Sequence, residues 1–353
     1  MVSHSAVQAS NALIASSLPS HLVAVFVGAT SGIGEATLKQ FAKHTREPRV
    51  YLVGRSQAAA DRIISECKTL TPLGNYTFIK ADVSLIRVVD DVCKQIVDRE
   101  KAVNILFLSA GVIELKTGTS ENLDLSLALT IYSRTRFIVN LLPLLQAAPA
   151  LRRVVTVFAG TKEGPIFPND FGCDKVSLFN IHSIRGHMCS MIDFSLEAIA
   201  KDAPSVSFIH DYPGFVDTGI FEKTSGALAS VVRGVSKVSD ALFRSRRERY
   251  IPIEQSGERH LFLATSARYG PANGEVLGTP LGREVAPARD SCGKVGGGVY
   301  VVDENLESAS PEVEKLLGQM RQDGMREKVW KHTEGEFNRI TGLMRDMEGL
   351  IDS

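Results

Sequence analysis

The chain has 353 residues, with 40 basic and 40 acidic side chains and 44% hydrophobic residues. This balance leaves no net field that would attract nucleic acid or an anionic membrane surface, and it favours a small-molecule partner. The five scattered cysteines lack the paired spacings of a zinc site or a disulfide framework, and no apolar run reaches the roughly 20 residues of a spanning helix. No basic leader followed by an apolar run is present either. We therefore expect a cytoplasmic protein with reduced cysteines, no metal and no membrane insertion.

In chain order, a short leading helix is followed by an alternation of short apolar runs and helical patterns. Such an alternation is typical of a parallel sheet whose strands are joined by right-handed crossover helices. The predicted strands are 21–27, 49–53, 76–81, 104–108, 153–158 and 205–210, and the predicted helices are 7–17, 35–44, 61–70, 88–96, 123–145 and 187–200.

The chain between the sixth and seventh predicted strands is much longer than a simple crossover requires. It runs over residues 219–290, the seventh strand is predicted at 298–302, and charged helices are predicted over 311–340. Loops at the carboxyl ends of parallel strands surround ligands, so we expect 219–290 to shape a substrate pocket. The amphipathic stretch 227–243 within it predicts a helix packed on the body, with a mobile lid or a membrane-facing helix as the alternative.

These patterns predict a doubly wound, mostly parallel seven-stranded α/β fold with a long insertion before the last strand and extra C-terminal helices. The expected organisation is a leading helix over 1–20, a dinucleotide-binding and catalytic domain over 21–305, and a helical extension over 306–353.

A glycine turn, Gly28-Ala29-Thr30-Ser31-Gly32-Ile33-Gly34, joins the first predicted strand to the next helix. In this context the backbone N–H groups and the helix dipole bind a pyrophosphate. The spacing of the three glycines resembles the glycine motif of the short-chain dehydrogenase/reductase superfamily, which has the Rossmann fold. The resemblance implies that every residue of the turn except Ala29 contacts a nicotinamide cofactor.

Three further segments resemble motifs of the same superfamily, and the likeness extends over about residues 20–305. Asp82-Val83 matches the acidic position that contacts the adenine. Ser109-Ala110-Gly111 resembles the turn beneath the cofactor, and Pro213-Gly214-Phe215-Val216-Asp217-Thr218 matches the segment beside the nicotinamide. The resemblance implies cofactor contacts at Asp82, Val83, Ser109, Ala110, Gly111, Pro213, Gly214, Val216 and Thr218.

Arg55, at the end of the second predicted strand, distinguishes between the two nicotinamide cofactors. An acid at this place would bind both ribose hydroxyls of NAD, whereas an Arg stacks on adenine and neutralises a 2′-phosphate. The sequence therefore predicts NADPH. The alternative is an Arg that forms only a surface ion pair.

The four residues that normally complete the chemistry of this superfamily are altered. The superfamily uses a Ser, a Tyr, a Lys and an Asn, because a developing alkoxide must be neutralised by a positioned acid. By alignment with the fifth strand and the two long helices, these positions fall on Ala159, His182, Gly186 and Thr130.

Three residues are candidates to replace the missing acid. His182 carries an imidazole, the side chain most often used for proton transfer at neutral pH. Thr161 carries the hydroxyl nearest to the serine position, and Tyr212 precedes the Pro-Gly segment. The alternatives are a helix-capping or solvated His, a solvated Thr and a structural Tyr.

Two functions follow from these observations. The first is an NADPH-dependent oxidoreductase that acts on a carbonyl or hydroxyl of a bulky small molecule, because the whole pattern resembles fungal natural-product pathway members of the superfamily. The second is a non-redox nucleotide-binding relative, an isomerase, cyclase or pseudoenzyme, because Ser, Tyr and Lys are all replaced. Superfamily members associate through the helices that correspond to 123–145 and 187–200, so we also expect a homodimer.

Overall fold

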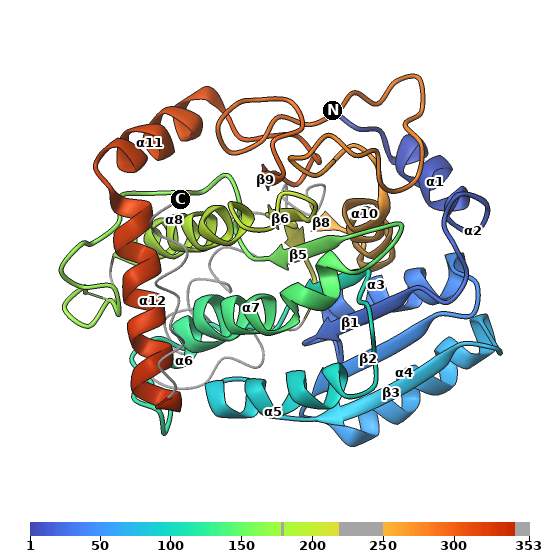
Figure 1. Cartoon of the computed structure of the whole chain (residues 1–353), viewed down its shortest axis with the longest axis horizontal. Helices are drawn as coiled ribbons and strands as arrows, with labels where there is room; N and C mark the ends of the chain where they lie inside the picture. The colour runs from blue at the N-terminus through green and yellow to red at the C-terminus, as the bar shows by residue number, and fades with distance from the viewer. Residues whose placement is uncertain (178–179, 219–249, 343–353) are drawn as a thin grey trace, which may run out of the picture.

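The computed structural model describes residues 1–177, 180–218 and 250–342. Seven strands form one sheet in the order β3-β2-β1-β4-β5-β6-β9, and all six pairings between them are parallel. The doubly wound α/β fold predicted from the sequence is confirmed, including the insertion before the last strand and the C-terminal helices (Figure 1). The strands are β1 (Val23–Val27), β2 (Arg49–Gly54), β3 (Asn75–Lys80), β4 (Ile105–Leu108), β5 (Arg153–Val157), β6 (Ser207–Asp211) and β9 (Val299–Val302).

The central strands are continuous apolar runs because helices cover both faces of the sheet. All five residues of β1 are buried, and β4 is buried throughout. In the register of the sheet, Val27 lies beside Val53 on one side and Leu108 on the other. The chain therefore leaves β1, β2 and β4 at one edge, where the strand order changes direction between β1 and β4. In open α/β sheets, ligands bind at such a switch point.

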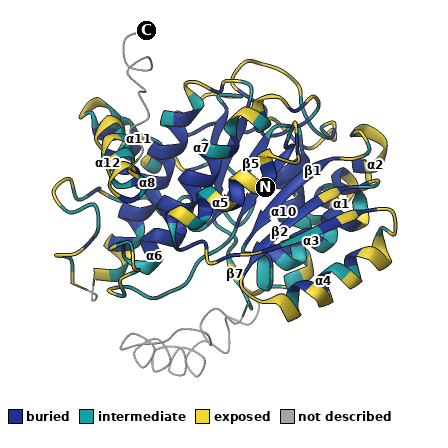
Figure 2. Cartoon of the chain, turned by 60° about the horizontal axis from the view of Figure 1, so that its bottom comes forward, coloured by how far each residue is buried: buried dark blue, intermediate teal, exposed yellow. Residues whose placement is uncertain are grey.

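Two helical layers enclose the sheet, as the buried segments in Figure 2 show. One apolar core contains Phe41, Ile63 and Phe262 from one layer, and the other contains Phe137 and Met191 from the opposite layer. The first layer consists of α1 (His4–Ala12), α3 (Gly32–His44), α4 (Gln57–Leu70) and α10 (Ile253–Thr265); the second consists of α5 (Ile86–Val97), α7 (Ser133–Gln146) and α8 (Ile181–Ala200), with α11 (Pro311–Gln322) and α12 (Met325–Thr341) outside them.

Several elements differ from the sequence-based expectation. The leading helix is interrupted at Leu13, so that α2 (Ile14–Ser17) is separate from α1, and α8 begins six residues before the predicted start. The long helix predicted at 123–145 is divided into α6 (Leu125–Leu127), the π-helical turn η1 (Ala128–Tyr132) and α7. The sequence analysis also missed α10 and the short parallel pair β7 (Phe215–Val216) and β8 (Tyr250–Ile251).

Two elements of the 219–290 insertion, β8 and α10, lie at different places in the fold. β8 pairs with β7 directly after β6, whereas α10 packs against α3 and α1 on the sheet's first layer. The amphipathic stretch 227–243 lies outside the described residues, and the pocket predicted for this insertion stays a prediction. Within 1–177, 180–218 and 250–342, no helix combines the length and the hydropathy needed to cross a bilayer.

Candidate cofactor site and catalytic centre

The glycine turn is packed tightly against the segment that follows β4. Gly28 has φ +87°, and a Cβ atom there would lie 2.3 Å from the backbone nitrogen of Ala110. A Cβ atom at Gly34 would lie 2.5 Å from Ser109 Oγ. Both the left-handed backbone and the close approach therefore require glycine. Gly32 opens α3, so the N–H groups at the start of this helix face the same edge, and these residues fit a pyrophosphate.

Two other predicted cofactor segments reach this turn. A Cβ atom on Gly32 would lie 3.1 Å from Thr218 Cβ, so the chain after β6 passes directly beside the turn. A Cβ atom on Gly54 would lie 2.7 Å from Thr30 Cγ2, so the end of β2 also adjoins it. Arg55 follows Gly54 and is exposed. The structure thus brings the turn, Arg55 and Thr218 together.

The remaining predicted cofactor residues line the same edge of the sheet. Asp82 is exposed, and its Oδ1 accepts hydrogen bonds from the backbone N–H of Ser84 at 3.1 Å and from the Ser84 hydroxyl at 2.8 Å. Val83 is buried, and the Ser109 hydroxyl donates to the Val27 carbonyl at 3.2 Å. Gly214 has φ +75°, and β7 begins at the next residue. The cofactor contacts of Asp82, Val83, Ser109, Ala110, Gly111, Pro213, Gly214 and Val216 stay predictions.

Arg134 is a structural residue of this edge that the sequence analysis missed. Its Nη1 donates to Thr156 Oγ1 at 2.7 Å and to the Val157 carbonyl at 2.8 Å, and its Nη2 donates to the Ala110 carbonyl at 2.8 Å. Burial lowers the pKa of Arg134 to about 9, which leaves the guanidinium charged at neutral pH. This buried cation therefore joins the ends of β4 and β5 beneath the site. The sequence signal that could have identified Arg134 is an Arg within the apolar face of a predicted helix.

Thr130, at the position of the relay Asn, is buried within the π-helical turn η1. Turns of this kind interrupt α-helices frequently at functional sites. A π-helical turn that the sequence did not predict therefore lies at the position of the relay Asn, where Thr130 lacks the amide side chain.

The loop after β5 surrounds Ala159, which occupies the serine position. The Ala159 N–H donates to His210 Nε2 at 3.4 Å, and the Cys189 thiol donates to the Ala159 carbonyl at 3.1 Å. Thr161, the predicted replacement, has φ +71°, and its buried Oγ1 has no hydrogen-bond partner within the described residues. Its backbone N–H donates to Glu163 Oε1 at 3.0 Å. The nearest hydroxyl is therefore beside the serine position but belongs to a strained turn.

The positions of the family's Tyr and Lys are not occupied by equivalent groups. His182 is exposed on the first turn of α8. Gly186 packs against the loop, since its carbonyl accepts from the Gly164 N–H at 3.0 Å and a Cβ atom there would lie 2.9 Å from Gly164. Only a residue without a side chain fits at this close approach. No ribose-binding Lys can therefore stand at Gly186.

Tyr212 has a cationic neighbour that the sequence analysis did not identify. The Nζ atom of Lys162 lies 4.9 Å from the centre of the Tyr212 ring. Burial raises the pKa of Tyr212, and the Glu304 carboxylate raises it further, whereas Arg185 lowers it. The structure thus pairs a half-buried phenol with a Lys from the loop after β5. Sequence spacing could not reveal this pair, because the two residues lie on different loops.

Comparison with known proteins agrees with this geometry. The family model described as short chain dehydrogenase matches residues 22–160. The chain is 39% identical to Oxidoreductase AN1596 of Emericella nidulans, over 95% of this chain and 97% of that protein. It is 32% identical to the Short-chain dehydrogenase/reductase SAT2 of Stachybotrys chartarum, over 89% of this chain and 91% of that protein. The chain belongs to the short-chain dehydrogenase/reductase family.

A solved structure of lower identity shares the fold. The L-sorbose reductase of Gluconobacter frateurii, solved with NADPH and L-sorbose, superimposes with a TM-score of 0.52 at 20% identity. The match covers 69% of this chain and 90% of that chain. At this identity the likeness concerns the fold alone.

Proposed function

We propose that this protein is an NADPH-dependent oxidoreductase that acts on a carbonyl or hydroxyl of a bulky small molecule of fungal secondary metabolism. The glycine turn carries this proposal, because Ser109-Ala110, Gly54 and Thr218 pack so closely against it that an added Cβ atom at each contact would lie only 2.3–3.1 Å from its neighbour. When bound, the nicotinamide supplies or accepts the hydride. The N-terminus of α3 binds the pyrophosphate, and Arg55 binds the 2′-phosphate.

Tyr212 is the proton donor in this proposal. A phenol with a raised pKa holds its proton at neutral pH, and the Lys162 ammonium stabilises the phenolate that remains after transfer. Thr161, whose hydroxyl lacks a partner among the described residues, orients the substrate oxygen in place of the missing Ser. His182 stays a second candidate acid, on the exposed first turn of α8.

A specific observation favours the second candidate function, a nucleotide-binding relative without redox turnover. The close contact between Gly164 and Gly186 removes the Lys position entirely. In this alternative the protein binds the same nucleotide, and substrate conversion leaves the cofactor unchanged. We also infer that the protein is cytoplasmic and dimeric, although α12 packs on α8 and would be part of any dimer face that includes this helix.

Calorimetric titration of NADPH and NADH into the full chain tests the cofactor assignment. We expect micromolar NADPH binding that Gly32→Asp abolishes, because the new side chain would meet Thr218 and place a negative charge at the pyrophosphate. Gly282→Asp is the matched control, because a side chain at this exposed loop position meets nothing within 4 Å. Absence of NADPH binding in the unaltered protein would refute the proposal. Substrate conversion without NADPH oxidation would favour the non-redox alternative.

A further inference from the structure

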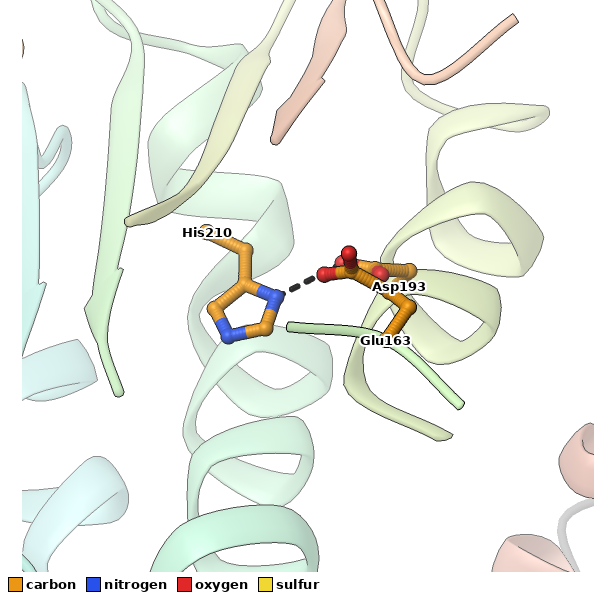
Figure 3. A group of neighbouring side chains, drawn as sticks. All are labelled: Glu163, Asp193 and His210. Carbon is orange, nitrogen blue, oxygen red and sulfur yellow. Dashed lines mark hydrogen bonds and ion pairs between the residues drawn. The ribbon is translucent and has the colours of Figure 1, made fainter. Parts of the chain in front are cut away.

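Three ionisable side chains converge beneath the loop that follows β5 (Figure 3). They are Glu163 from this loop, Asp193 from α8 and His210 from β6, and one possible ligand atom of each lies within 4.8 Å of the others. Asp193 and His210 are 0% exposed. The cluster adjoins the catalytic centre, because His210 also contacts the backbone of Ala159.

The hydrogen bonds of His210 define where its ring proton lies. The Ala159 N–H points at Nε2, which must therefore act as an acceptor. The ring proton is then on Nδ1 and is donated to Asp193 Oδ1 at 2.7 Å. Burial lowers the pKa of His210 to about 4, in agreement with a neutral imidazole. The ring consequently brings no positive charge to the two carboxyl groups.

The two carboxyl groups face each other without a balancing cation. Within the described residues, no Lys or Arg forms an ion pair with Glu163 or Asp193. Glu163 Oε2 and Asp193 Oδ2 are both buried, and neither atom has a hydrogen-bond partner among the residues that the structure describes. Two adjacent buried carboxylates repel each other and are poorly solvated, so that a single proton between them removes both penalties.

We propose that Glu163 and Asp193 share one proton at neutral pH, and that this buried pair stores the proton consumed when the substrate carbonyl is reduced. The storage role rests on the proposed function. In that reaction the hydride adds to the carbonyl carbon and Tyr212 gives its proton to the carbonyl oxygen. The carboxyl pair then gives its proton to the Tyr212 phenolate and regains one from solvent. The site lies against Ala159, where the superfamily's serine hydroxyl is absent.

A divalent cation fits the cluster less well than a proton. Coordination by Nδ1 of His210 would require the ring proton to move to Nε2. Nε2 would then present an N–H to the N–H of Ala159, which already points at this atom. The ring orientation therefore favours a proton over a metal ion.

Other charged groups surround the cluster on four elements. Arg321 of α11 donates to Glu197 of α8, and Arg134 of α7 donates to groups at the ends of β4 and β5, so that neither forms an ion pair with the cluster. Burial, together with the neighbouring Asp193 carboxylate, raises the pKa of Glu163 to about 8. The ionisable neighbours are Arg134, Arg185, Cys189, Glu197, Asp211 and Arg321.

Thermal unfolding of the full chain as a function of pH tests the shared proton. When the pKa of a carboxyl is higher in the folded state than in the unfolded state, the protonated carboxyl stabilises the fold. This stabilisation is complete at pH values below the unfolded-state pKa and is lost as the pH rises through the folded-state pKa. Glu163→Gln resembles the protonated acid at every pH. The Tm of the variant minus that of the unaltered protein should therefore increase by roughly 3 to 6 °C between about pH 5 and about pH 9.

Two controls complete this experiment. Glu284→Gln changes an exposed carboxyl and should give a difference in Tm that does not vary with pH. Asp193→Asn removes the other carboxylate of the pair. Its Tm relative to the unaltered protein should increase with pH as it does for Glu163→Gln, which keeps the test valid if one variant folds poorly. The measurement needs no cofactor, so it is independent of the titration with NADPH.

Two outcomes would overturn the shared proton, and a third would overturn only its role in reduction. A pH-independent difference for both variants would show that neither carboxyl holds an extra proton. An increase in Tm on adding Mg²⁺, Mn²⁺ or Zn²⁺ to the unaltered protein, absent in Glu163→Gln, would show a metal site instead. If the difference in Tm increases with pH but the protein does not bind NADPH, the carboxyl pair shares a proton that has no role in reduction.

Discussion

Arg55 is the side chain to which we assign the proposed preference for NADPH. It follows β2 directly, beside the contact between Gly54 and Thr30, and it is exposed. None of the ion pairs among the described residues involves Arg55, so the alternative of a surface ion pair has no support there. The guanidinium is therefore available for a 2′-phosphate, which it can bind through two parallel hydrogen bonds.

Replacing this cation by an acid tests the assignment. We expect Arg55→Asp to weaken NADPH binding by roughly 10- to 100-fold, because a charge-assisted contact of about 1.5–3 kcal/mol is lost. NADH binding should change little or improve, because an acid at this position binds both ribose hydroxyls. Calorimetry with both nucleotides measures the two effects, with Arg283→Asp on an exposed loop as the control. Equal weakening of NADPH and NADH would contradict the role of Arg55.

At the scale of elements, α12 belongs to the folded core although it follows the last strand of the sheet. It packs against α8 and α5. Tyr132 OH lies 2.7 Å from His332 Nε2, and the guanidinium of Arg136 lies 5.2 Å from the centre of the Phe337 ring. The His332 ring also stacks on Phe171 at 4.6 Å, which connects α12 to the loop before α8. The C-terminal extension therefore supports the helices that carry the site.

Truncation of one buried α12 side chain measures this support. Phe337 is 4% exposed, so Phe337→Ala should lower the free energy of unfolding by about 3–5 kcal/mol through lost burial and a new cavity. Gly335→Ala is the matched control on the same helix, because a methyl group there meets nothing within 4 Å. Urea unfolding followed by circular dichroism provides the comparison. A loss in Phe337→Ala no larger than in the control would show that α12 is not part of the cooperative fold.

At the scale of the whole molecule, the parallel sheet separates two apolar cores and leaves the carboxyl ends of its strands for the ligand. The segments that meet at the glycine turn come from β1, β2, β4 and the chain after β6. A ligand at this edge contacts segments that are distant in sequence, so its binding stabilises the fold as a unit.

This linkage can be measured without a substrate. NADPH at about 100 times its Kd should stabilise the folded chain by about 2.7 kcal/mol, which corresponds to a rise in Tm of roughly 3 to 4 °C for a chain of this length. Differential scanning calorimetry with and without the nucleotide gives this shift, and Gly32→Asp should show none. A comparable shift in the Gly32→Asp variant would place the nucleotide away from the glycine turn.

The sequence by itself determined the sheet and the glycine turn. Apolar runs, helical periodicity and turn residues are local signals, and each lies within one stretch of chain such as 21–27 or Gly28 to Gly34. The order of the motifs along the chain then reproduced the order expected for a doubly wound fold. The sequence did not predict the division of the long helix at η1 or the helix α10, because tertiary packing determines both.

Only the tertiary structure decided which ionisable groups meet. Lys162 and Tyr212 lie on the loops after β5 and β6, and Asp193 reaches His210 from a helix packed on this sheet face. Neither contact follows from sequence spacing, because each depends on the pairing of β5 with β6 and on the side of the sheet that α8 covers. Burial then shifts the pKa values of Tyr212, Asp193 and His210, since the cost of desolvating charge exists only after the chain has folded.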